Sequence, residues 1–266
     1  MLFYKTLENK VSDQWVVFVH GAGGSSAIWY KQLRAFSEEF NVLLIDLRGH
    51  GQSQPMFKRV FHSPYTFPNI SKDIIEVLDF LSIIKAHFVG ISLGSIVIRS
   101  LGEQAPERIQ SMVLGGAVTR LDTRSKLLVF GGNLVKRFVP YMWLYKLYAF
   151  IIMPKKNHSE ARKLFVSQAK KLRQAEFVKW FKLTNGINKL LSYFKEKELN
   201  LPTLYIMGSE DHLFLEPVKL IVQKHAFSML KVIEDCGHVV NVEQPDTFNQ
   251  MSIAFIKNQK LEASTV

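Results

Sequence analysis

Short apolar runs, separated by segments with helical spacing, constrain the fold of this chain most. The runs fall at 15–20, 41–46, 86–91, 111–116, 202–208 and 229–235. Each is nearly continuous and rich in Val, Ile and Phe, which suits a strand buried on both faces of a parallel sheet. Between them, 70–84 places its apolar residues on one helical face, and 245–259 opens with a typical first helical turn. The alternation predicts an α/β fold with a doubly wound, mostly parallel sheet.

The strand rhythm stops in the middle of the chain and resumes near its end. Residues 118–200 are helical in character and rich in Lys, Phe, Tyr and Leu. The chain carries a net charge of +11, and residues 120–200 hold 18 of its 34 Lys and Arg but only 5 of its 23 Asp and Glu. We therefore expect two domains: a sheet core formed by 1–117 and 201–266, and a basic helical cap formed by 118–200.

Composition places the chain among ordinary globular proteins, with 47% hydrophobic and 21% charged residues. Cys236 is its single cysteine, so no disulfide can form within the chain. The first ten residues have no basic segment followed by an apolar run, so we expect no signal peptide. No apolar run reaches the roughly 20 residues of a spanning helix. These features favour a cytoplasmic protein.

A serine lies between two glycines at the junction of a predicted strand and a predicted helix, in Gly90-Ile91-Ser92-Leu93-Gly94. Ligands of such sheets bind beyond the carboxyl ends of the strands, where Ser92 falls. A sharp turn there exposes the hydroxyl, and glycines on both sides relieve crowding in the turn. The spacing G-x-S-x-G alone is a weak signal, but its position between strand and helix predicts a nucleophile.

A serine hydroxyl needs a base, and the base needs an acid to orient it. His238 follows the last predicted strand, and Asp211 follows the strand before it. The sequence predicts that His238 accepts the proton of Ser92 and that Asp211 holds the imidazole. Glu210 and Asp235 lie close in sequence and remain rivals of Asp211 at this point.

A glycine-rich turn, His20-Gly21-Ala22-Gly23-Gly24, follows the first of these apolar runs. Glycines let backbone N–H groups approach a ligand oxygen, so we assign the oxyanion hole to the backbone N–H groups of Ala22 and Leu93. A phosphate cradle is the alternative function of such a turn. The turn lacks the spacing G-x-x-x-x-G-K-[ST], and the chain has no G-x-G-x-x-G, which disfavours nucleotide binding.

Together these segments resemble the α/β-hydrolase superfamily. The resemblance rests on HGAGGS, DLRGHGQS, GISLGS, GSEDH and the GH pair at 237–238, which keep the family's order. It implies an eight-stranded, mostly parallel sheet with a helical lid, no cofactor and no metal. It also implies structural roles for His20, Arg48 and His50, which belong to family motifs and are expected to brace the loops.

The nucleophile narrows the expected chemistry. Family members with aspartate at the elbow include haloalkane dehalogenases and many epoxide hydrolases, and Ser92 argues against both. Serine suits a hydrolase of small or acyl-chain carboxylic esters, thioesters or lactones, acting through an acyl-enzyme. The lyase of menaquinone synthesis usually has Gly-Arg after the elbow, where this chain has Ser95-Ile96. A C–C hydrolase or lyase and a small-molecule sensor on the same fold are the alternatives.

The predicted cap carries clustered aromatic residues, among them Trp143, Tyr145 and Tyr148. They are expected to line an apolar substrate pocket, although packing of the cap onto the sheet explains them as well. Lysines beside aromatics, as in 170–182, suit a solvated helix face or weak contact with an anionic membrane surface. We expect a small ester-like molecule as partner and no nucleic acid. The oligomeric state stays open.

Overall fold

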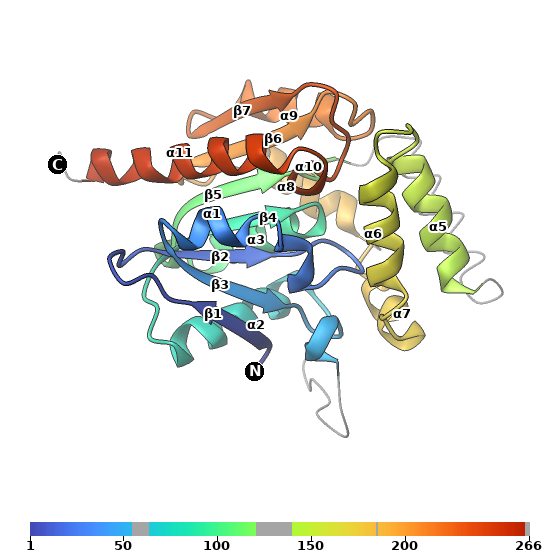
Figure 1. Ribbon diagram of the computed structural model, residues 1–266, viewed down its shortest axis with the longest axis horizontal. Helices are drawn as coiled ribbons and strands as arrows, with labels where there is room; N and C mark the ends of the chain where they lie inside the picture. The colour runs from blue at the N-terminus through green and yellow to red at the C-terminus, as the bar shows by residue number, and fades with distance from the viewer. Residues whose placement is uncertain (55–63, 121–139, 185, 264–266) are drawn as a thin grey trace.

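The computed structural model describes residues 1–54, 64–120, 140–184 and 186–263, which form one sheet flanked by helices (Figure 1). The seven strands of these residues are β1 (Phe3–Leu7), β2 (Trp15–Val19), β3 (Asn41–Asp46), β4 (Ala86–Ile91), β5 (Ile109–Gly115), β6 (Thr203–Gly208) and β7 (Ser228–Ile233). Their order is β1-β3-β2-β4-β5-β6-β7, with β1 antiparallel to β3 and every other neighbouring pair parallel. The predicted α/β class is confirmed, with seven described strands where the resemblance implied eight.

Helices cover both faces of the sheet. They are α1 (Leu33–Ser37), α2 (Phe67–Phe80), α3 (Leu93–Gln104), α5 (Tyr141–Ile152), α6 (Ser159–Ala169), α7 (Gln174–Lys182), α8 (Ile187–Glu196), α9 (Leu215–Val222), α10 (Val240–Glu243) and α11 (Pro245–Ala263). Short 3-10 turns occupy Ser26–Trp29, Gly51–Ser53 and Pro106–Arg108. None of the helices among the described residues is long and apolar enough to cross a membrane.

The continuous apolar runs of the sequence become strands that are buried from both sides. Along β2, Val16 and Phe18 belong to the cluster that packs under α1 and α11, whereas Val17 and Val19 belong to the cluster under α2, α3 and α9. Successive side chains of a strand point to opposite faces, so a strand covered on both sides has to be apolar at every position. The sheet is therefore doubly wound, as predicted.

Among the described residues between β5 and β6 there are four helices, α5 to α8, and we call them the insertion helices. Helices α5, α6 and α7 lie beyond the carboxyl ends of the strands, at the right of Figure 1. Helix α8 instead packs on the core, where Leu191 and Phe194 join the cluster that contains α3. The Arg99 guanidinium of α3 also lies over the Phe194 ring. Residues 121–139 and 185 of the expected cap lie outside the described residues.

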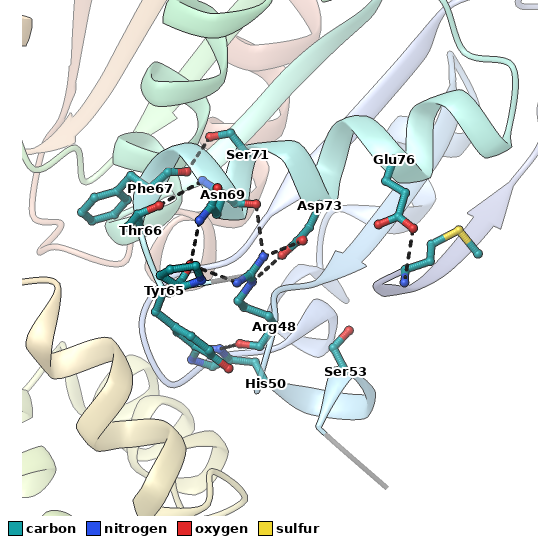
Figure 2. A network of polar contacts seen from close by, with 12 residues as sticks. Arg48, His50, Ser53, Tyr65, Thr66, Phe67, Asn69, Ser71, Asp73 and Glu76 are labelled. Carbon is teal, nitrogen blue, oxygen red and sulfur yellow. Dashed lines mark hydrogen bonds and ion pairs between the residues drawn. The ribbon is translucent and has the colours of Figure 1, made fainter. Parts of the chain in front are cut away.

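A buried polar network joins α7 to the loop after β3, and Figure 2 shows its core side. Arg48 is fully buried and bonds both oxygens of Asp73 on α2, at 2.5 and 2.6 Å. Trp180 of α7 donates its indole N–H to the Arg48 carbonyl at 3.0 Å, and Tyr65 donates its hydroxyl to Glu176 of α7. Arg48 thus has the bracing role that the resemblance implied, and it anchors an insertion helix to the core.

Candidate active site

Ser92 lies at the turn between β4 and α3, at the carboxyl edge of the sheet. Its backbone has φ 53° and ψ −117°, a combination that residues with a side chain rarely adopt. A Cβ at Gly94 would lie 2.3 Å from the Val19 carbonyl oxygen, and one at Gly90 would lie 2.5 Å from a side chain of α3. The two glycines are therefore needed because β2 and α3 approach the turn too closely for any side chain.

Ser92, His238 and Asp211 are joined by two hydrogen bonds. His238 Nε2 lies 3.0 Å from Ser92 Oγ, and His238 Nδ1 lies 2.7 Å from Asp211 Oδ2. An ionised carboxylate only accepts hydrogen bonds, so Nδ1 carries the proton and Nε2 is left to accept from the serine hydroxyl. The side chains of His238 and Asp211 are buried, while Ser92 is partly exposed. The three residues lie in the arrangement that proton transfer from a serine requires.

Neither rival of Asp211 bonds the imidazole of His238. Asp211 is held by a second bond, from the Phe214 N–H to Oδ1 at 3.2 Å, and the Phe214 ring packs on His238. Glu210 instead accepts a hydrogen bond from Lys155 at 2.6 Å. Asp235 is exposed. Of the three carboxylates left open by the sequence, the structure therefore places only Asp211 on the imidazole of His238.

A polar bracket that sequence reasoning missed connects α6 to both loops of the site. His158, directly before α6, lies 2.7 Å from Glu210 through Nε2 and 3.7 Å from Glu243. Glu243 accepts the backbone N–H groups of Gly237 at 2.7 Å and Val239 at 3.2 Å, which flank His238. Hydrogen bonds, first from Lys155 and then from Asn157, lower the pKa of Glu210 to about 2. The sequence signal for this bracket was weak: Glu210 and Glu243 lie close in sequence to Asp211 and His238, whereas His158 does not.

The backbone N–H groups of Ala22 and Leu93 form no hydrogen bond with any described residue. Both residues are partly exposed. Their two turns lie close together, since a Cβ on Gly21 would lie 3.3 Å from Ser92 Cβ. The N–H of Gly23, by contrast, donates to His50 Nε2 at 3.0 Å. The structure therefore leaves the two predicted donors available beside the serine and engages the neighbouring one.

Two buried histidines support this turn. His20 Nε2 accepts the Leu47 N–H at 3.0 Å, and its other nitrogen lies 2.8 Å from the Gly21 carbonyl. Burial lowers the pKa of His20 and lowers that of His50 well below the ordinary value. Both rings are therefore neutral and can accept a backbone N–H. They brace the turn, in line with the role that the resemblance implied.

The three aromatic residues predicted to line the pocket have different positions. Tyr145 of α5 is buried, and a Cβ on Gly23 would lie 2.7 Å from its hydroxyl oxygen. Tyr148 is half-buried and stacks on Phe181. Trp143 points away, because it lies on the opposite face of α5 from Tyr145 and its side chain is 70% exposed. The structure thus brings Tyr145 to the turn beside Ser92 and does not bring Trp143 there.

Metal binding needs several ligating side chains at one place. Among the residues that the structure describes, no group of three or more His, Cys, Asp or Glu is placed to hold a metal ion. Cys236, the single cysteine, is buried. The expectation of a site without metal or cofactor, which came from the resemblance, stays a prediction.

Comparisons with known proteins concern the family and the fold. A family model described as alpha/beta hydrolase fold matches residues 14–139. The chain is 27% identical to 3-oxoadipate enol-lactonase 1 of Acinetobacter baylyi, over 91% of this chain and 88% of that protein. It is also 27% identical to a protein named "Putative carbamate hydrolase RutD" from the same organism, over 93% and 96% of the two chains. The crystal structure of a hydrolase from Pseudomonas aeruginosa superposes with a TM-score of 0.80 and 25% identity, over 95% and 93%.

Proposed function

The chain belongs to the α/β-hydrolase superfamily and is a hydrolase of that fold, and from this premise we propose that it is a serine hydrolase of carboxylic esters, lactones included. The observation that carries the proposal is the chain of hydrogen bonds from Ser92 through His238 to Asp211. The nucleophile, the base and the orienting acid come from three different loops at one edge of the sheet. This arrangement matches the proton-transfer chain that an activated serine needs.

The first half of the reaction forms an acyl-enzyme. Ser92 Oγ attacks the ester carbonyl carbon while its proton moves to His238 Nε2. The imidazolium that forms is stabilised by Asp211, whose carboxylate lies 2.7 Å from Nδ1. The tetrahedral intermediate then collapses, the bond to the alcohol oxygen breaks, and His238 returns the proton to that oxygen. For a lactone, the alcohol stays attached to the acyl group.

The oxyanion of each tetrahedral intermediate needs donors that are already in place. We assign this role to the N–H groups of Ala22 and Leu93, which have no partner among the described residues. Leu93 is the first residue of α3, so the positive end of the helix dipole also favours the negative charge. In the second half, His238 takes a proton from water, the hydroxide attacks the acyl carbon, and Ser92 regains its proton as the acid leaves.

The substrate side of the proposal rests on the insertion helices acting as a cap over the site. Tyr145 presents a hydroxyl beside Gly23 that bonds no described residue, and burial raises its pKa, so the group stays a donor at neutral pH. We assign Tyr145 to the substrate pocket, with Tyr148 further along α5. A carbamate is the second candidate substrate, because one curated relative bears that name. The same serine and oxyanion donors would serve both carbonyl classes.

The test is a substrate panel assayed with wild type and Ser92→Ala. It comprises p-nitrophenyl esters from acetyl to palmitoyl, an enol-lactone, a saturated lactone and a p-nitrophenyl carbamate. Steady turnover of esters or lactones that disappears in Ser92→Ala supports the proposal. Turnover of the carbamate alone favours the second candidate. Absence of turnover on the whole panel overturns the proposal and favours a sensor or C–C bond cleavage.

A further inference from the structure

Helix α5 exposes an apolar face. Trp143, Leu147 and Phe150 are 70%, 51% and 59% exposed, and their spacing places them on one side of the helix. The opposite side, with Tyr145 and Ala149, is buried. Exposed apolar residues that cluster, unlike scattered ones, mark a surface that binds another apolar phase.

A cationic groove of about 370 Å³ borders this face, between α5 and α6. It is lined by Lys146, Phe150, Arg162, Lys163, Val166, Ser167 and Lys170. The lining of this described groove holds four basic residues and no Asp or Glu. Lys146, Lys163 and Lys170 form no ion pair with any described residue, and Arg162 lies over the Phe150 ring while its guanidinium bonds backbone carbonyls.

We propose that the outer face of α5 and α6 is a docking surface for an anionic lipid bilayer. Aromatic and leucine side chains on a helix, bordered by lysines, are the pattern of helices that lie in the membrane interface. Tryptophan is favoured at that depth. The lysines of the groove, which form no ion pair with described residues, complement phosphate headgroups. A protein partner would instead need several carboxylates to pair with these lysines and an apolar pocket to receive Trp143.

The same helix connects this surface to the candidate active site. Its inner face carries Tyr145, which lies against the turn of Gly23 beside Ser92. When the protein is docked on a bilayer through α5, its insertion helices lie between the bilayer and the candidate active site. The docking surface does not depend on the reaction proposed above, so the two proposals can fail separately.

The experiment measures binding to large unilamellar vesicles by co-sedimentation, with phosphatidylcholine alone or with about 30% phosphatidylglycerol. We expect the wild type to bind the anionic vesicles at low salt, to bind neutral vesicles little, and to be released as ionic strength screens the charges. Tryptophan fluorescence should shift to the blue on binding, because Trp143 leaves water.

Two variant pairs separate charge from insertion, and each has a matched control. Lys146→Gln/Lys163→Gln should weaken binding about 30-fold, since each lysine near an anionic surface contributes about a fivefold factor. Lys85→Gln/Lys189→Gln makes the same change in net charge away from the groove and should have little effect. Trp143→Ser/Phe150→Ser should abolish the blue shift and weaken binding.

The control for insertion is Phe80→Ser/Ile84→Ser, which removes exposed apolar side chains at the end of α2 and just before the amino end of β4. Thermal melts establish that all four variants stay folded. The proposal is overturned if the wild type does not bind anionic vesicles at low salt, or if each control pair weakens binding as much as its partner. It is also overturned if Trp143→Ser/Phe150→Ser leaves vesicle binding intact but converts a dimer to a monomer in light scattering.

Discussion

Asp211→Asn isolates the role of the buried carboxylate, because the structure dictates how the asparagine must orient. The Phe214 N–H, 3.2 Å from Oδ1, needs an acceptor, and His238 Nδ1 lies 2.7 Å from Oδ2. An asparagine offers one acceptor and one donor for these two positions. With its oxygen toward Phe214, its NH2 group faces Nδ1 and forces the proton onto Nε2. His238 then cannot accept the proton of Ser92.

The expected loss follows from two contributions. In the productive orientation the asparagine oxygen faces His238 Nδ1, so its NH2 group faces the Phe214 N–H, and two buried donors oppose each other at a cost of about 2 kcal/mol. In either orientation the charge-assisted bond to the imidazolium, worth about 3 kcal/mol, is lost. A total of about 5 kcal/mol corresponds to a fall in kcat of roughly 5,000-fold. This agrees with the ~10⁴-fold effect of the equivalent change in serine proteases.

The assay is steady-state hydrolysis of the best ester or lactone of the panel by Asp211→Asn, with a thermal melt to establish folding. Asp235→Asn is the matched control, because it neutralises an exposed carboxylate close in sequence and should leave kcat unchanged. A kcat for Asp211→Asn within about 30-fold of the wild type would refute the assigned proton positions.

Three other predictions concern the surroundings of the site. Gly94→Ala should lower the free energy of unfolding by about 3 kcal/mol in chemical denaturation, since its Cβ would meet a backbone oxygen at 2.3 Å; an unchanged midpoint would contradict the close packing. His158→Gln should lower kcat about tenfold with little change in KM, because the bracket positions both loops; a fall in stability alone would contradict this positioning role. Glu210→Gln should be less stable than wild type at neutral pH. The low pKa of Glu210 makes its stabilisation complete above its ordinary value of 4.5 and lost as pH falls toward 2, so melting curves at several pH values should converge in that window, and a constant gap would exclude the ion pair as the cause.

The positions of Ser92, Asp211 and His238 were predictable because each lies in the loop that begins at the carboxyl end of a strand. Parallel strands end at one edge of the sheet, so residues distant in sequence meet there whatever the details of packing. The strand β1 was missed for a related reason. It is a partly exposed edge strand, and its sequence FYKTL lacks the continuous apolar pattern that strands buried on both faces require.

The contacts of the insertion helices could not be derived in this way. Apart from Lys146, helix α5 is apolar or aromatic on every side, so its sequence indicates poorly which face turns inward. Trp143 and Tyr145 were therefore assigned to the same pocket although they lie on opposite faces. The bracket through His158 depends on how α6 packs against two loops of the core. No periodicity in the sequence encodes that placement.

The central claim, that Ser92 is a nucleophile activated by His238, is tested most directly by trapping the acyl-enzyme. The wild type is mixed rapidly with a p-nitrophenyl ester, nitrophenolate release is followed on the millisecond scale, and the quenched protein is analysed by intact mass and peptide mapping. We expect a burst of one nitrophenolate per chain and one acyl group on Ser92, both lost in Ser92→Ala and strongly slowed in His238→Ala. An acyl group on another residue, or turnover that survives in Ser92→Ala, would contradict the role of Ser92 as the nucleophile.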